Sequence, residues 1–83
     1  MGKRIKEWAF PNLEMWMWEL QISASDLADL LHVTRQTVYY KLYGKSAWSS
    51  LEKKLIREHF EKITKRKITD DFLFKQEDSN GKN

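Results

Sequence analysis

The sequence predicts an all-α fold of five short helices, and three observations carry this prediction. Apolar residues recur at the i, i+3, i+4 spacing of one helix face, as in Leu13, Trp16 and Met17. A hydroxyl residue suited to accept a backbone N–H stands before each of the four later helices. No stretch alternates apolar and polar residues as a half-buried strand does. The candidate N-caps are Ser23, Thr34, Ser49 and Thr69.

The first helix is expected to begin at Phe10-Pro11-Asn12, because proline suits a first turn in which its missing N–H has no partner to lose. A second helix over 24–31 should follow Ser23, with Asp26 completing a capping box. The expected apolar sides are Leu13, Trp16, Met17 and Leu20 on the first helix, and Leu27, Ala28, Leu30 and Leu31 on the second.

A third helix over 35–43 is expected after Thr34, with Gly44 just beyond its end and Val38 and Leu42 as its core pair. Ser49 and Glu52 form a second capping box before a fourth helix that ends near Ile63. A short fifth segment, 72–74, follows the cap at Thr69. The expected apolar side of the fourth helix is Leu51, Leu55, Ile56, Phe60 and Ile63.

These elements divide the 83 residues into a basic N-terminal arm (1–9), one folded domain (10–74) and a disordered polar tail (75–83). The chain has no cysteine, so aromatic packing must stabilise a small core, and we expect Trp16 and Trp48 in it and Trp8 beside Phe10. No apolar stretch is long enough for a membrane span or a signal peptide, and a cytoplasmic protein is expected.

The sequence does not favour an enzyme, because it contains neither a glycine-rich phosphate loop nor a recognisable nucleophile–base pair. We therefore expect no catalytic residues and no cofactor. Asp26, Asp29 and His32 are spaced three apart, but helix capping and solvent exposure explain them better than a metal site does, and no metal is expected.

The most informative stretch is 23–44, in which two short helices are separated by the three residues His32, Val33 and Thr34. Ala28 is small where the two helices would cross, and Val33 is apolar within the turn. This is the pattern of a helix-turn-helix. His32 occupies the turn position that glycine usually takes, so we expect a positive φ there, which histidine tolerates better than most residues.

Several segments together resemble the Cro/repressor-type helix-turn-helix family, also called lambda-repressor-like or XRE-like. The similarity is greatest to small regulators of phages and prophages of Gram-positive bacteria. The resemblance implies five helices, a DNA-binding role and usually a homodimer. The matching segments are 10–13, 23–28, 33–38, 41–45 and 68–74.

Helical geometry identifies the residues that would read DNA. At about 100° per residue, Gln36, Tyr40 and Tyr43 point away from the core direction set by Val38 and Leu42. Glutamine can pair with adenine and arginine with guanine in the major groove. The expected base-reading residues are Thr34, Arg35, Gln36, Tyr39 and Tyr40.

The DNA backbone is expected to contact both ends of the motif. The second helix begins with two serines, where backbone N–H groups favour an anion. The resemblance also places the residue after Gly44 against a phosphate. No acidic residue occurs between Asp29 and Glu52. The expected backbone contacts are Ser23, Ser25, Thr37, Tyr43, Lys45 and Ser46.

The predicted function is therefore a sequence-specific transcriptional regulator of a phage or mobile element, which binds a double-stranded operator as a homodimer. The alternative is a protein-interaction module on the same fold, such as an antirepressor or an inhibitor of a host defence protein. Met15 and Trp18 lie off the apolar stripe and mark its candidate interface. The exposed tyrosines could also contact protein. The Lys65-Arg66-Lys67 segment is either an ordinary loop or a second backbone contact.

Overall fold

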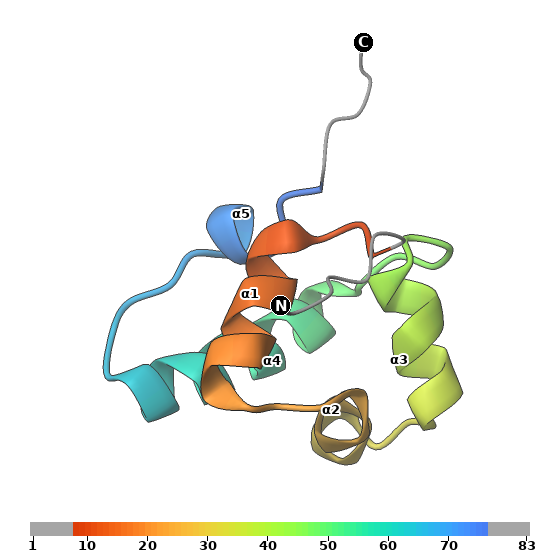
Figure 1. Ribbon diagram of the computed structural model, residues 1–83, viewed down its shortest axis with the longest axis horizontal. Coiled ribbons are helices and arrows are strands. Elements are labelled where there is room, and N and C mark those ends of the chain that lie inside the picture. Colours follow the sequence, from red (N-terminus) through yellow and green to blue (C-terminus); the bar gives the residue numbers. More distant parts are fainter. Residues whose placement is uncertain (1–7, 77–83) are drawn as a thin grey trace, which may run out of the picture.

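Five helices and no strand make up the described part of the chain, residues 8–76 of a computed structural model (Figure 1). The all-α prediction and the helix count are confirmed. The predicted first turns are also correct, since Ser23, Thr34, Ser49 and Thr69 each accept a backbone N–H three residues on. The helices are α1 (Pro11–Leu20), α2 (Ala24–Leu31), α3 (Arg35–Leu42), α4 (Ser50–Thr64) and α5 (Asp70–Leu73).

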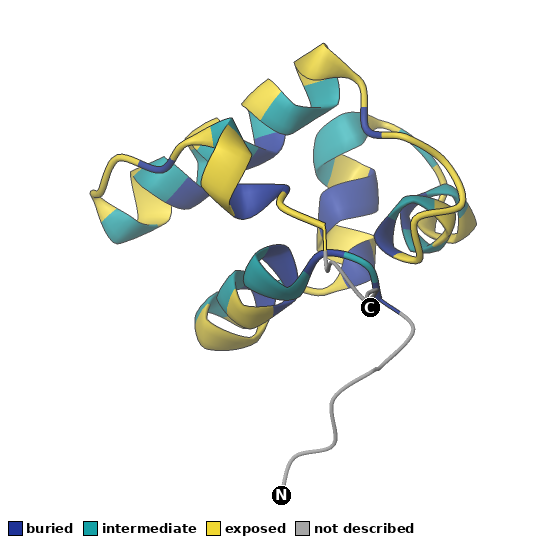
Figure 2. Ribbon diagram, turned by 90° about the horizontal axis from the view of Figure 1, so that it is seen from above, coloured by how far each residue is buried: buried dark blue, intermediate teal, exposed yellow. Residues whose placement is uncertain are grey.

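The helices enclose one apolar core, to which every helix contributes. α2 packs against α3 and α4, and α5 packs against α1 and α4. The buried parts of the ribbon face the interior between the helices, and the exposed parts face outward (Figure 2). The completely buried apolar side chains are Leu13, Leu27, Val38, Leu42, Ile56, Phe60 and Leu73.

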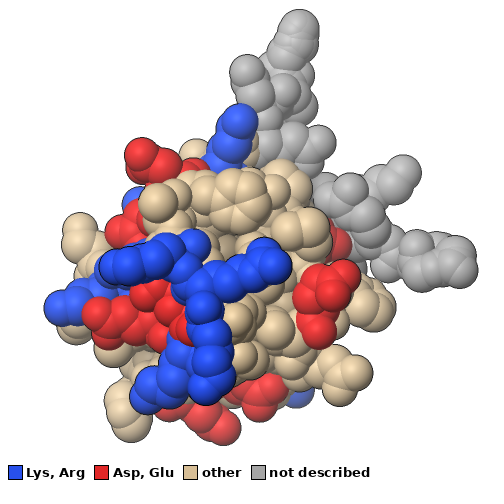
Figure 3. Space-filling model, turned by 90° about the vertical axis from the view of Figure 1, so that its left-hand side faces the viewer, with Lys and Arg blue, Asp and Glu red and all other residues tan. Residues whose placement is uncertain are grey.

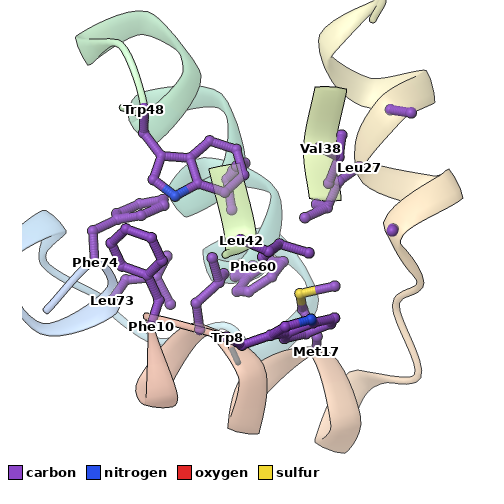
Figure 4. Packing of buried hydrophobic residues seen from close by; sticks show 14 of the residues in the cluster. Trp8, Phe10, Met17, Leu27, Val38, Leu42, Trp48, Phe60, Leu73 and Phe74 are labelled. Carbon is purple, nitrogen blue, oxygen red and sulfur yellow. The ribbon is translucent and has the colours of Figure 1, made fainter. Parts of the chain in front are cut away.

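Aromatic rings pack one end of this core (Figure 4). Phe10 meets Trp48 and Phe74 edge to face, with both pairs of ring centroids 6.3 Å apart. Trp48 and Phe74 lie 5.6 Å apart, so the three rings form a closed group. Trp48 is in the core as predicted, and aromatic packing takes the place of disulfides in this cysteine-free chain.

The fold begins earlier than the predicted boundary at Phe10. Trp8 is buried in the core, and the Ala9 N–H donates to the Leu42 carbonyl oxygen over 2.8 Å. These two residues therefore belong to the domain rather than to a basic arm. Residues 1–7 of the predicted arm and 77–83 of the predicted tail lie outside the described residues, and Lys75 and Gln76 are exposed.

The predicted apolar side of α4 is wrong at both ends. Leu51 is 64% exposed and Ile63 is 45% exposed, whereas Ile56 and Phe60 are completely buried. At about 100° per residue, Leu51 lies on the side of the helix away from Ile56. Ile63 is on the buried side, but it lies one turn beyond the covered part of the helix.

Two other burial predictions need correction. Trp16 and Leu20 on α1, and Leu30 and Leu31 on α2, are only half-buried and pack against the edge of the core. Glu14 is buried instead, with 2% of its surface exposed, although sequence periodicity offers no reason for it. α1 is therefore buried along Leu13, Glu14 and Met17, a stripe shifted from the predicted one.

Candidate nucleic-acid interface

α2 begins with the capping box that the sequence predicts. The Ser23 hydroxyl accepts the Asp26 N–H at 3.1 Å, and the Asp26 carboxylate accepts the Ser23 N–H at 2.9 Å. Two backbone donors are satisfied in this way, which fixes where the helix starts. Asp26 thus has a structural role. Ser23 and Ser25 remain exposed at this end of the helix.

The turn between α2 and α3 has the backbone geometry expected of it. His32 adopts a left-handed conformation, with φ at 60°, and the Val33 N–H donates to the Ala28 carbonyl oxygen at 3.0 Å. This arrangement closes the end of α2 and reverses the chain. Val33 packs against the core, and the Thr34 hydroxyl then accepts the Thr37 N–H at 3.1 Å to begin α3.

The two faces of α3 have opposite characters. Val38 and Leu42 are completely buried, whereas Gln36 and Tyr40 are exposed, as the helical spacing predicts, and Arg35 is exposed in the first turn of the helix. The Gln36 amide nitrogen donates to the Tyr40 hydroxyl over 3.3 Å. A guanidinium, an amide and a phenol are therefore presented together on a helix that the core holds in place.

Two further residues of the predicted set, Tyr39 and Thr37, are less available for contact. Tyr39 is half-buried against the core edge and stacks on Tyr43, with ring centroids 6.1 Å apart and planes 22° apart. Thr37 is half-buried, and its hydroxyl is 2.9 Å from that of Thr34. Tyr43 keeps an exposed ring beside Tyr39, and Thr34 is exposed at the start of the helix.

Lys41 has a structural role in the fold. Its Nζ donates to the Glu52 carboxylate and to the Ala47 carbonyl oxygen, both at 2.9 Å. The same ammonium lies 5.9 Å from the centre of the Trp48 ring. The pair is 11 residues apart, so helix spacing gave no signal for it.

This ion pair also changes the acidity of Glu52. Burial by itself would raise the pKa of its carboxyl, but the Ser49 N–H and the Lys41 ammonium together lower the pKa below the ordinary value. The Glu52 oxygen that accepts from Lys41 also accepts the Ser49 N–H at 2.9 Å. One carboxylate therefore joins the cap of α4 to the end of α3 and fixes the loop between them.

Lys45 and Ser46 are exposed in that loop, immediately after a glycine with a required conformation. Gly44 has φ at +83°, and a Cβ at this position would lie 3.0 Å from the Cβ of Ala9. The Lys45 N–H donates to the Tyr40 carbonyl oxygen at 2.9 Å, so this lysine begins just beyond the end of α3. The structure thus leaves Lys45, unlike Lys41, free to meet an anion.

Met15 and Trp18 are both exposed, but they line two different depressions on either side of α1. Trp18 borders one of about 350 Å³ together with Ile22 and Tyr39. Met15 borders another of about the same volume with Trp16 and Arg66. Each residue borders its own depression, and a protein interface at Met15 and Trp18 stays a prediction.

The acidic and basic residues of α4 are partly paired, as their spacing suggests. Arg57 contacts Glu61 at 3.4 Å and Asp70 at 2.8 Å, and the hydrogen bond to Asp70 raises the pKa of the guanidinium. The Ile68 N–H donates to Glu61 and lowers the pKa of that carboxyl. These contacts hold α5 against α4.

Across residues 8–76, no three His, Asp or Glu side chains are grouped so as to hold a metal ion.

Comparison with known proteins adds nothing to this geometry, because no protein-family model, curated protein or solved structure matches the chain significantly. Within the described ranges, no helix has both the length and the apolar character that a membrane span requires.

Proposed function

We propose that this protein is a sequence-specific, double-stranded DNA-binding transcriptional regulator of the helix-turn-helix type, with α3 as its reading helix. The observation that carries the proposal is the outer face of α3, where Gln36 and Tyr40 are exposed together, with Arg35 exposed in the first turn of the same helix. The opposite face of the same helix anchors it to the core through Val38 and Leu42. A rigid helix with a polar outer face is what major-groove reading requires.

The chemistry of this face favours DNA over other partners. An arginine can donate two hydrogen bonds to guanine, and a glutamine can pair with adenine through both its amide atoms. The Gln36–Tyr40 hydrogen bond orients the amide before it meets a base. A tyrosine ring can also contact a thymine methyl group. Arg35 lies in the first turn of α3, where a cation gains nothing from the helix dipole, so an external anion would satisfy it better.

Contacts to the DNA backbone complete the proposed interface. Lys45 and Ser46 lie beyond one end of α3, and the exposed Ser23 and Ser25 begin α2. Backbone N–H groups at a helix start favour phosphate. An exposed lysine adds a positive charge, whose attraction for phosphate weakens as the salt concentration rises. Tyr43 can donate its hydroxyl to a phosphate oxygen. Lys41 is not included, because Glu52 already neutralises it.

A binding titration tests the proposal. A duplex is selected from a random double-stranded library, and its affinity is compared with that of a scrambled duplex by fluorescence anisotropy. We expect the selected duplex to bind at least about a thousandfold more tightly, because specific recognition usually exceeds non-specific binding by that factor. Equal affinities for the two duplexes would refute sequence-specific binding.

Two variants separate base contacts from phosphate contacts. Arg35→Ala should cost about 1–3 kcal/mol and relax specificity at one base pair, whereas Lys45→Ala should weaken binding to every duplex and reduce the salt slope by about one unit. Lys54→Ala is the matched control, because Lys54 is an exposed lysine on α4 and no part of the proposed interface.

The proposed regulator acts as a homodimer in the cytoplasm, and it represses by occupying a promoter. Two α3 helices would then enter successive major grooves of a near-palindromic operator, about one helical turn apart. Sedimentation of the protein with duplexes carrying one or two half-sites measures this directly. Binding of a single copy to a two-site duplex at saturation would exclude the dimer.

A protein-interaction function is the second candidate, and the depression beside Trp18 favours it. Trp18 is 62% exposed, and the floor of the depression includes Met17, Ile22 and Ala24. An apolar hollow next to an exposed tryptophan is typical of a protein contact. Ionic strength distinguishes the two functions, because DNA affinity falls steeply with salt and an apolar protein contact does not.

A further inference from the structure

The end of α4 carries a group of cations on the side of the molecule away from α3. Figure 3 shows Lys and Arg side chains gathered on the side that lies to the left in Figure 1, where α4 ends, and α3 lies to the right. Lys65, Arg66 and Lys67 are all exposed there. None of the three is within salt-bridge distance of a carboxylate of the described chain, but Lys67 lies near Glu61 and contributes to the lowered pKa of that carboxyl. A duplex held by α3 would not reach this side of the same copy.

An apolar depression lies beside these cations. Met15, Trp16 and Thr64 line it, and its volume is about 350 Å³. Arg66 borders the depression, and Glu19 is the one acidic residue in its wall. Met15 is 45% exposed, and Ile63 on the last turn of α4 exposes as much of its surface. Apolar and basic surface therefore meet at one place, between α1 and the end of α4.

We propose that this surface, defined by Met15, Trp16, Arg66 and the flanking Lys65 and Lys67, binds an acidic peptide segment that carries an apolar anchor residue. The anchor would fill the depression against Met15 and Trp16, and the carboxylates beside it would meet the three cations. Charge complementarity with the three cations favours an acidic segment over a neutral or basic one. A nucleic acid would use the cations but leave the apolar wall uncovered, so the surface fits a protein better.

This inference goes beyond the proposed DNA binding, because it concerns another face of the molecule and a different class of partner. A regulator with both surfaces could hold DNA through α3 and recruit an acidic protein segment through the opposite side. An exposed apolar hollow with a polar rim is the usual form of such a contact.

The test uses the full chain and a fluorescein-labelled peptide that places Phe and Leu between runs of Asp and Glu. We expect saturable binding by fluorescence anisotropy. A peptide with Ser in place of Phe and Leu should bind about tenfold more weakly, because it lacks the anchor. The absence of saturable binding, or equal binding of the two peptides, overturns the proposal.

Variants locate the binding on the protein. Arg66→Glu should weaken peptide binding about tenfold and Met15→Ser about fivefold. Lys54→Glu and Leu51→Ser are the matched controls, since they make the same kinds of change at exposed positions elsewhere on α4. Equal losses in the controls would overturn the assignment. Thermal unfolding followed by circular dichroism confirms that each variant is folded.

A last comparison separates this proposal from DNA binding. Arg35→Ala should leave peptide affinity unchanged, and Arg66→Glu should leave the affinity for a selected duplex unchanged. If Arg66→Glu instead weakens binding of a labelled DNA duplex and not of the peptide, the cations form a nucleic-acid contact and the proposal is wrong. Failure of DNA binding alone would leave the peptide result intact.

Discussion

The inner face of α3 stabilises the fold and its outer face is exposed, although residues of the two faces are neighbours in the chain. The inner face, with Val38 and Leu42, is completely buried, and the Lys41–Glu52 ion pair extends this structural role to the edge of the helix. The outer face carries Gln36 and Tyr40, which are both exposed and share one hydrogen bond. The fold therefore does not need the outer residues, which leaves them available to a ligand.

The largest expected difference between the two faces is in stability, and truncating one residue on each face measures it. Leu42→Ala should lower the free energy of unfolding by about 2–5 kcal/mol, because it leaves a cavity in the core. Tyr40→Ala, two residues away, should change it by no more than about 0.5 kcal/mol. Urea denaturation measures both values. Similar losses in the two variants would show that the faces are not distinct.

The total stability of a small domain is only several kcal/mol, so the cavity left by Leu42→Ala is large enough to unfold it. Leu42→Val removes a single methylene and should cost about 1 kcal/mol. This milder variant still exceeds the expected effect of Tyr40→Ala, so the comparison can be made even where Leu42→Ala does not fold.

The second prediction concerns the outer face alone. Gln36→Ala should weaken binding to a selected duplex by about 1–3 kcal/mol, with the free energy of unfolding unchanged within about 0.5 kcal/mol. The loss should disappear on duplexes in which the base pair read by Gln36 is already altered. An equal loss on every single-base-pair variant would mean that Gln36 contacts no base.

Local signals in the sequence were sufficient for the helix starts and for the inner and outer faces of α3. Each hydroxyl cap acts within three residues, and His32 is left-handed as expected, because these effects depend only on neighbouring residues. The same locality explains the exposure of Gln36 and Tyr40, which follows from the spacing of Val38 and Leu42 alone.

Contacts between distant parts of the chain could not be predicted in this way. Lys41 pairs with a residue 11 positions away, and Ala9 bonds to the end of α3, so neither follows from helix spacing. The apolar pattern of α4 also does not reveal where neighbouring helices stop covering it, which is why Ile63 was wrongly placed in the core. The ligand of the outer face of α3 also cannot be predicted in this way, because it depends on the chemistry of a second molecule.

The third prediction tests whether Lys41 belongs to the inner, structural face. Lys41→Met should lower the free energy of unfolding by about 1 kcal/mol at neutral pH, because it breaks a partly buried ion pair. Duplex binding by the folded fraction should not change. A loss of DNA affinity without a loss of stability would show that Lys41 contacts DNA.

The pH dependence of this effect has a definite sign. The pKa of Glu52 is lowered in the folded state, so its contribution to stability is present above the ordinary value of 4.5 and is lost as the pH falls through the lowered pKa. The difference in unfolding free energy between wild type and Lys41→Met should therefore shrink as the pH is reduced from 7 to 3. The Arg57 contacts are present in both proteins, so their pH dependence does not affect this difference in unfolding free energy. A difference that stays constant with pH would exclude Glu52 as the partner that matters.

The smallest predicted effect lies at two helix ends, in the turn between α2 and α3 and at the end of α1. His32 and Gln21 both end a helix in the left-handed conformation, with φ at 60° and 57°. Glycine adopts this conformation without the steric cost of a side chain, but it also increases the freedom of the unfolded chain. His32→Gly and Gln21→Gly should each stabilise the protein by about 0.5 kcal/mol, as measured by thermal unfolding. Because His32 acts only through the backbone of the turn, neither variant should change DNA affinity. If His32→Gly alone weakens binding, the imidazole itself contacts the ligand, and the recognition surface extends from α3 into the turn.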